Sequence, residues 1–438
     1  MRSFVPIVGN QLVVLVLGLI GMKLISHYVP VVLNGYYGIF VTLAQISMLV
    51  THSDVANHAT RYWQRETTRP GTYARFLWSV SWRKARLLAP LLLIILLIRA
   101  WTQQELIWVW MFPLLLLSNF GLTFNAIGTG VFNADRKPWH VLLLTSVGTT
   151  ARVFLPIGFG LLTQMNFTAL SAGYTLHGII IIACLVLMLR QVIGAPAPTA
   201  ELIRQWMQEL RSYGRPFLFL GIGAWLLLHV DRWIVDQFYE KARVGLFTYA
   251  AYLGAIIPTV TATAMMQAFF PGIFRRADLA KTPADWRMLG TRCDQLTILF
   301  VILSLAGLVA LHFLTPLLIG SLIDRDYAPV LPMIIPAGLV MLNSQINQFY
   351  YLLLQGQHNS AGMVWVMLAV AAIKTLGGIA AAAISWEAFL GWLILAPLVC
   401  GWIGRALILQ MTLQKPLGPP DPATTSIKRG PDATSYHD

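Results

Sequence analysis

Four positively charged side chains lie inside apolar segments that are long enough to cross a membrane: Lys23, Arg152, Arg232 and Lys374. A charge at bilayer depth is costly, so each one is a functional hypothesis by default. Arg152 and Lys374 are predicted near mid-span, and Lys23 and Arg232 in the outer third of their segments. Arginine can hold phosphate through two hydrogen bonds, whereas lysine acts as a point charge. The set therefore predicts a cationic, water-filled cavity that binds an anionic group.

The alternative for each cation is snorkelling, in which the long side chain reaches the headgroups. It is easier for Lys23 and Arg232 than for the two mid-span cations. Asp231 is the only comparably placed acid, and it precedes Arg232 directly. Sequence neighbours on a helix point about 100° apart, so these two do not face each other. Asp231 is therefore expected to pair with Lys23 across the cavity or to bind a coupling cation, unless it is a helix-end acid in wet headgroups.

Amide side chains form a second polar set in three of the apolar segments. Amides are good hydrogen-bond partners for sugar hydroxyls, which predicts a polar lining of the cavity. The alternative is that they join helices to one another. The residues are Asn10, Gln11, Asn119, Asn125, Asn343, Asn347 and Gln348.

No catalytic or cofactor motif is found in the sequence. A nucleophile elbow, a phosphate-binding glycine loop and zinc-ligand spacing are all absent. Cys184, Cys293 and Cys400 are far apart, which argues against a disulfide or metal framework. Neither an enzyme nor a bound cofactor or metal is predicted.

The composition places the chain in a membrane. Of its 438 residues, 57% are hydrophobic and 11% are charged, whereas soluble domains carry about 25% charged residues. Continuous apolar runs predict helices rather than a barrel, and about twelve are long enough to span. The predicted all-α spans are 4–29, 33–52, 85–101, 106–132, 139–163, 168–190, 215–238, 244–274, 295–319, 330–354, 361–384 and 387–411.

Most of the 31 Lys and Arg residues fall on one side of these spans, chiefly in long loops predicted at 53–84, 191–214 and 275–294. The positive-inside rule then places both termini in the cytoplasm; the bacterial inner membrane as the location is implied only by the family resemblance given below. The net charge of +13 reflects these loops, so it does not predict a nucleic-acid partner.

An internal repeat is predicted from two similar segments, GIFVTLA at 38–44 and GLFTYAA at 245–251. Two halves of six helices that both start inside form a parallel repeat, as in many transporters. The repeat matches the segment of Lys23 with that of Arg232, and the segment of Arg152 with that of Lys374. The predicted parts are an N-lobe, a cytoplasmic linker, a C-lobe and a disordered cytoplasmic tail, at 1–190, 191–214, 215–412 and 413–438.

Five short segments carry a family resemblance: YGRP at 213–216, DRWI at 231–234, VGLFTYAAY at 244–252, YAPVLP at 327–332 and NADRK at 133–137. In these the chain resembles the polysaccharide transporter branch of the multidrug/oligosaccharidyl-lipid/polysaccharide exporter superfamily, which includes the O-antigen flippases. The resemblance implies two six-helix lobes around a central cavity and alternating access.

The resemblance also implies an undecaprenyl-pyrophosphate-linked oligosaccharide as substrate. Its head would cross in the cavity while the polyprenyl tail stays in the membrane lipid. Antiport of H⁺ or Na⁺ would supply the energy, and a glycan polymerase is a candidate partner.

Two other functions stay open. A multidrug exporter of the same fold would bind cationic drugs through cavity acids, but here intramembrane cations outnumber the one acid. A membrane-embedded glycan polymerase or glycosyltransferase would need acids or a sizeable loop at the outer surface, where only short loops are predicted.

Overall fold

The computed structural model describes residues 4–414, except residues 67, 136, 189–194, 278, 281 and 358. Helices make up nearly all of this part. The first lobe contains α1 (Phe4–Tyr28), α2 (Val31–Tyr62), η1 (Trp63–Glu66), α3 (Pro70–Gln103), α4 (Ile107–Trp110), α5 (Phe112–Ala134), α6 (Pro138–Leu162) and α7 (Phe167–Met188). The linker contains α8 (Ala200–Glu209) and the π-helical turn η3 (Leu210–Gly214). The second lobe contains α9 (Arg215–Phe238), α10 (Lys241–Ala277), α11 (Pro283–Leu318), η4 (Arg325–Met333), α12 (Ile334–Gly356), α13 (Ser360–Ile384) and α14 (Trp386–Gln414).

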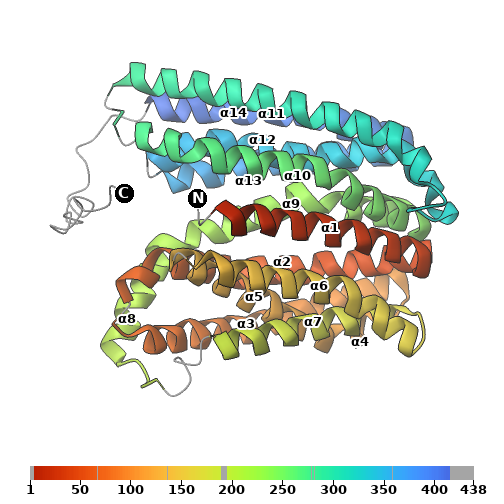
Figure 1. Ribbon diagram of the computed structural model, residues 1–438, viewed down its shortest axis with the longest axis horizontal. Coiled ribbons are helices and arrows are strands. Elements are labelled where there is room, and N and C mark those ends of the chain that lie inside the picture. The colour runs from red at the N-terminus through yellow and green to blue at the C-terminus, as the bar shows by residue number, and fades with distance from the viewer. Residues whose placement is uncertain are drawn as a thin grey trace.

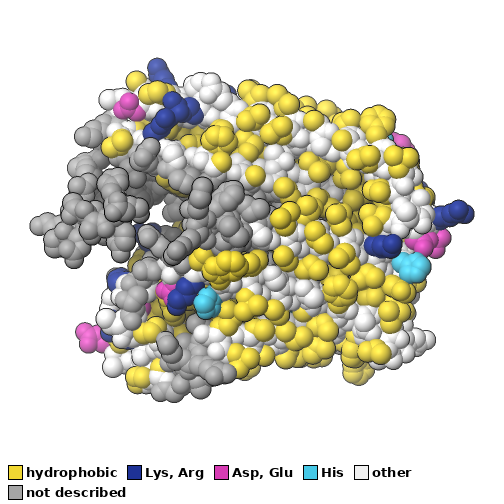
Figure 2. Space-filling model, in the orientation of Figure 1, with side chains coloured by type: hydrophobic (Ala, Val, Ile, Leu, Met, Phe, Trp, Pro, Cys, Tyr) yellow, Lys and Arg dark blue, Asp and Glu magenta, His cyan; other side chains and the backbone are white. Residues whose placement is uncertain are grey.

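Eleven helices in the described part are long and apolar enough to cross a bilayer, and α1 adds a shorter apolar segment, Leu12–Tyr28. Figure 2 shows hydrophobic side chains over the middle of one face, with charged side chains gathered near the two ends. The predicted all-helical membrane protein with about twelve spanning helices is confirmed.

The connecting segments predicted at 53–84 and 275–294 are largely helical, because α2, α3 and α11 extend well beyond their apolar parts; for 53–84 this favours the amphipathic helix, which the sequence allowed, over a solvated loop. α2 continues to Tyr62, α3 begins at Pro70 and α11 begins at Pro283. A capping box between Thr282 and Asp285 fixes the start of α11. An apolar window marks only the part of a helix that lies in lipid, so it misses turns stabilised by packing beyond the bilayer.

The two lobes repeat the same helix packing. α1 packs on α6, α2 on α5, and α7 on both α5 and α6. The corresponding pairs in the second lobe are α9 with α13, α10 with α12, and α14 with both α12 and α13. The order of helices is the same in both lobes, which is what a parallel repeat requires.

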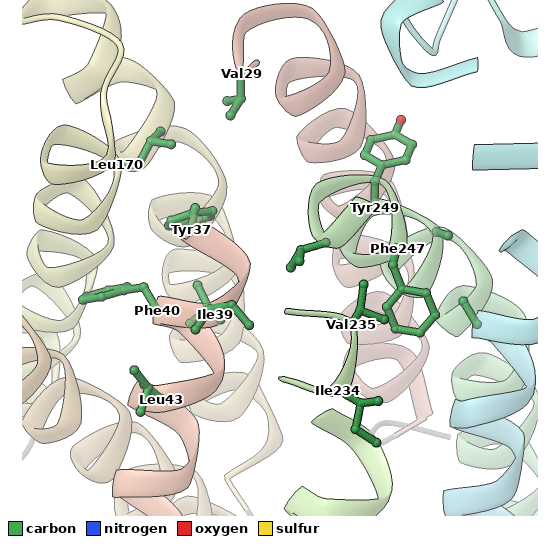
Figure 3. Close-up of a cluster of buried hydrophobic side chains, with 14 of the residues drawn as sticks. Val29, Tyr37, Ile39, Phe40, Leu43, Leu170, Ile234, Val235, Phe247 and Tyr249 are labelled. Carbon is green, nitrogen blue, oxygen red and sulfur yellow. The ribbon is translucent and has the colours of Figure 1, made fainter. Parts of the chain in front are cut away.

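The bundle has two unlike ends. α1 begins and α14 ends on the side where α8 lies, which we call the linker end; the opposite side is the far end (Figure 1). One hydrophobic cluster at the far end draws on both lobes, and its α2 residues Tyr37 to Leu43 lie between Leu170 of α7 and Ile234 of α9 (Figure 3).

Toward the linker end the hydrophobic clusters are separate. One contains second-lobe residues such as Phe349. Another contains first-lobe residues such as Tyr73 together with Trp206 of α8. The lobes thus share a hydrophobic core at the far end and have separate cores toward the linker end, where α2 and α9 still meet: Ser53 Oγ donates to the carbonyl oxygen of Phe217 at 3.1 Å.

Candidate functional site

Lys374 and Asp231 form a buried ion pair inside the second lobe. Both side chains are almost fully buried, and the Lys374 ammonium contacts Asp231 Oδ2. The same ammonium donates a hydrogen bond of 2.7 Å to the carbonyl oxygen of Leu227, one turn earlier on α9. Asp231 Oδ1 has no hydrogen-bond partner in the described part of the chain. The predicted pairing of Asp231 with Lys23 is therefore wrong, because α9 packs on α13 within its own lobe.

Arg152 occupies the position in the first lobe that Lys374 occupies in the second. Each is the fifteenth residue of a 25-residue helix, α6 or α13. α6 packs on α1 as α13 packs on α9, but the sequence of α1 contains no Asp or Glu. The repeat thus places a cation in both lobes and an acid only in the second.

The side chain of Arg152 lies on the inner side of the first lobe. Its charge acts electrostatically on Tyr37 of α2 and on Tyr174 and His177 of α7, all of them buried. Arg152 itself is exposed, and no ion pair holds it in the described part of the chain. It is a cation near the contact between the lobes that no carboxylate neutralises.

Arg232 is the cation of the second lobe that no ion pair holds in the described part of the chain. It is 4% exposed, and among the described atoms its Nε and Nη1 have no hydrogen-bond partner. Its guanidinium lies 4.7 Å from the ring centroid of Tyr252 on α10. A cation–π contact stabilises the charge but leaves its N–H groups unbonded. Burying such donors without partners is costly, so Arg232 is suited to an anion that would accept from them.

Three tyrosines lie near the two arginines. The rings of Tyr37 and Tyr174 have centroids 6.1 Å apart, and Tyr252 lies within electrostatic range of both. The Tyr174 hydroxyl is buried without a hydrogen-bond partner in the described part. Arg152, Arg232, Tyr37, Tyr174 and Tyr252 form what we call the inter-lobe cluster.

The sequence predicted the two arginines of this cluster but not its tyrosines. A usable signal was present, because Tyr37 directly precedes the first repeat segment and Tyr252 directly follows the second. The chemistry of the cluster is anion binding: two guanidinium groups, one from each lobe, and an unbonded phenol that can donate a hydrogen bond.

The amides are distributed differently from the predicted lining. Asn119 is buried and donates to Ser47 Oγ at 3.1 Å, so it joins α5 to α2. Asn343 and Asn347 are fully buried in the second lobe with unbonded amide groups, and Asn347 lies against Gly404 of α14. Asn125 and Gln348 are half-buried. Asn10 and Gln11 belong to α1, but their side chains lie outside the described part.

Lys23 stands apart from the other cations. It lies on an exposed position of α1 near the far end, and no ion pair involves it in the described residues. Of the four intramembrane cations, the structure thus brings Arg152 and Arg232 to one cluster, neutralises Lys374 and leaves Lys23 at the surface.

A second polar group joins the lobes at the far end. Arg99 of α3 donates to Asp236 of α9 at 2.5 Å, and Lys241 of α10 contacts the other carboxylate oxygen. Gln103 donates to Asp236 at 3.2 Å and accepts from Lys241 at 3.0 Å. We call these four residues the far-end cluster. Nothing in the sequence predicted that these four residues meet.

A cavity of about 640 Å³ lies at the linker end along one face of α8, η3 and the start of α9. Arg204, Arg211 and Arg215 line it, together with Met207, Gln208 and Ser212. The described lining contains three cations and no acid, so this cavity also favours an anion.

Known proteins resemble this chain in fold but not in sequence. No family model and no curated protein matches the sequence. Among solved structures, an inward-facing conformation of a multidrug resistance MATE family transporter of the MOP superfamily aligns with a TM-score of 0.68 and 11% identity, over 94% of this chain and 100% of that one. An outward-facing conformation of a transporter with the same description gives a TM-score of 0.58 at 12% identity, over 92% and 95% of the two chains.

The lipid II flippase MurJ, in an inward closed conformation, aligns with a TM-score of 0.63 and 14% identity, over 95% of this chain and 88% of that one. The chain therefore has the fold shared by these transporters and this flippase, and the predicted fold is confirmed. The polysaccharide branch of the superfamily stays a prediction.

Proposed function

We propose that this chain is a flippase that moves an undecaprenyl-pyrophosphate-linked oligosaccharide across the bacterial inner membrane by alternating access, with the linker end in the cytoplasm. The observation that carries the proposal is the pair Arg152 and Arg232. One comes from each lobe, and neither is neutralised by a carboxylate in the described part. A diphosphate bound between them would contact both lobes at once.

The far-end contact gives the proposed substrate a site closed on one side. The hydrophobic cluster around Ile39 and Val235 joins the lobes there, whereas the cores separate toward the linker end. Arg204, Arg211 and Arg215 would meet the anionic head first as it enters from the linker end.

A multidrug exporter has the same fold, so charge has to distinguish the two functions. Binding of a cationic drug would need a free carboxylate near the lobe contact. Asp231 is held by Lys374, and Asp236 is held by Arg99 and Lys241. Asp231 and Asp236 are thus already paired with cations, whereas Arg152 and Arg232 are not, which favours an anionic substrate.

The test is direct binding by protein in nanodiscs, with a short-chain polyprenyl pyrophosphate that carries a sugar. Arg152→Gln and Arg232→Gln should each raise Kd by roughly 10- to 100-fold, because one charge-assisted interaction contributes about 1.5–3 kcal/mol. Arg83→Gln is the matched control, an exposed arginine of α3 near the linker end. The phosphate-free polyprenol should bind weakly to all four proteins.

An unchanged Kd in both variants would show that the inter-lobe cluster does not bind the diphosphate. Tight binding of cationic dyes by the wild type, without binding of the diphosphate, would support the multidrug exporter instead.

A further inference from the structure

We propose that the Lys374 ammonium occupies the position beside Asp231 where a monovalent cation would otherwise bind. This lobe would then take up no Na⁺ or other monovalent cation from solution. The inference goes beyond the proposed function and does not depend on what is transported. It rests on the geometry of one ion pair and on the absence of its counterpart in the other lobe.

The surroundings of the Lys374 ammonium are those of a small cation site. Its ligands are a carboxylate oxygen of Asp231 and the carbonyl oxygen of Leu227 at 2.7 Å. Hard monovalent cations take the same kinds of ligand, carboxylate and carbonyl oxygens. The side chain of Lys374 is completely buried, so its charge is not shared with bulk water.

The backbone at Lys374 is held by its neighbours. Trp392 of α14 donates to the carbonyl oxygen of Lys374 at 2.9 Å. A Cβ on Gly377 would lie 2.2 Å from the Trp392 ring, and a Cβ on Gly378 would lie 3.0 Å from Ile234 of α9. α13 therefore lies close against both α9 and α14 just beyond Lys374, which holds the backbone at Lys374 beside α9 while this packing is intact.

The repeat shows that acid and lysine belong together. Arg152 holds the equivalent position in the first lobe, where the sequence of α1 has no acid, and its side chain is exposed. The second lobe has the acid, and there the cation turns inward and is buried. The pair is thus neutral as a unit, and an external cation at Asp231 would have to share the site with an ammonium.

Removing the ammonium should uncover the site. Lys374→Ala leaves a buried carboxylate, a nearby carbonyl and the volume of a lysine side chain. A buried charge that loses its partner is strongly destabilising. A cation that binds only the folded state restores stability as its concentration rises. The variant should therefore become dependent on a cation that the wild type ignores.

The experiment measures Tm of the purified full-length protein in detergent, with NaCl exchanged for choline chloride at constant ionic strength. The wild-type Tm should be the same in both salts. The Tm of Lys374→Ala should be lower in choline chloride and should rise by roughly 3 °C or more at about 200 mM NaCl. The double variant Asp231→Asn with Lys374→Met removes both charges and should show no response to Na⁺.

Two results would overturn the inference. One is a wild-type Tm that rises with NaCl and loses this rise in Asp231→Asn, which would mean that Asp231 binds Na⁺ beside the lysine. The other is a folded Lys374→Ala whose Tm ignores Na⁺. If Lys374→Ala does not fold, the wild type and Asp231→Asn still test the inference. It requires that the Tm of each is the same in NaCl and in choline chloride.

Discussion

Arg99 of α3 and Asp236 of α9 form a 2.5 Å ion pair that joins the two lobes at the far end. Both side chains are buried, and the Arg99 guanidinium also lies 4.1 Å from the ring centroid of Trp108 and 5.0 Å from that of Trp233. Alternating access requires the far end to open while the linker end closes. Under the proposed function this pair has to break in that step, so it would stabilise the state seen here.

Asp236→Asn is therefore expected to shift the equilibrium toward a far end that is open. Truncating one partner of a buried, hydrogen-bonded charge pair costs about 2–5 kcal/mol, which corresponds to a shift of more than tenfold. Spin labels at Gln104 and Glu387, exposed positions at the far end of the two lobes, would report the longer distance by pulsed electron resonance. Lys137→Ala, which breaks an exposed pair with Asp135, should leave that distance unchanged.

Gly245 allows the two lobes to approach most closely at the same end. A Cβ on Gly245 would lie 1.9 Å from the carbonyl oxygen of Val31, and Asn34 Nδ2 donates to the carbonyl oxygen of Gly245 at 2.9 Å. Gly245→Ala should lower Tm by several degrees, since overpacking costs about 1–3 kcal/mol. Gly18→Ala is the control, because a Cβ there meets nothing within 4 Å. It should keep or raise Tm, and an equal fall in both variants would contradict the prediction.

The sequence could predict the membrane class and the helices because both follow from local hydrophobicity, and it indicated the repeat through the similar segments at 38–44 and 245–251. It also placed Arg152 and Lys374 in corresponding helices, and the structure puts them at the same position of α6 and α13. The pairing of Lys374 with Asp231 was not predictable, because periodicity does not say which helices cross. The far-end cluster was missed for the same reason: Arg99 and Asp236 come from different lobes.

Glu66 links the linker helix α8 to the first lobe. It accepts hydrogen bonds from Arg69 at 2.8 Å, from Arg65 at 3.2 Å and from Trp206 of α8 at 3.2 Å. Burial raises the pKa of Glu66, but the hydrogen bonds from Arg69, Trp206 and Arg65 outweigh burial and hold its pKa below the ordinary value. A lowered pKa means that the folded state favours the carboxylate.

The docking of α8 should accordingly be stable above the ordinary carboxyl pKa of about 4.3 and weaken as pH falls through the lowered value. Glu66→Gln should weaken docking at neutral pH and abolish the acid dependence. The mobility of a nitroxide at Gln208, an exposed position on α8, measures this. If the mobility of the nitroxide already rises as pH falls from 8 to 6, a group other than Glu66 controls the docking of α8.

The hydroxyl of Tyr174 is buried without a hydrogen-bond partner in the described part of the chain, so it adds little to folding. Tyr174→Phe should leave Tm unchanged or slightly higher, because an unbonded buried polar atom is removed. If the hydroxyl donates to the substrate diphosphate, Kd should rise roughly 5- to 10-fold, the effect of one hydrogen bond of about 1 kcal/mol or slightly more.

Tyr327→Phe is the control with the opposite expectation. Its hydroxyl donates to the carbonyl oxygen of Val29 at 2.8 Å and is also buried. Removing it leaves that carbonyl unbonded, so Tm should fall while Kd for the diphosphate stays the same. The two variants thus distinguish a hydroxyl that binds the ligand, expected for Tyr174, from one that stabilises the fold, expected for Tyr327. A fall in Tm for Tyr174→Phe with unchanged Kd would assign Tyr174 to the fold as well.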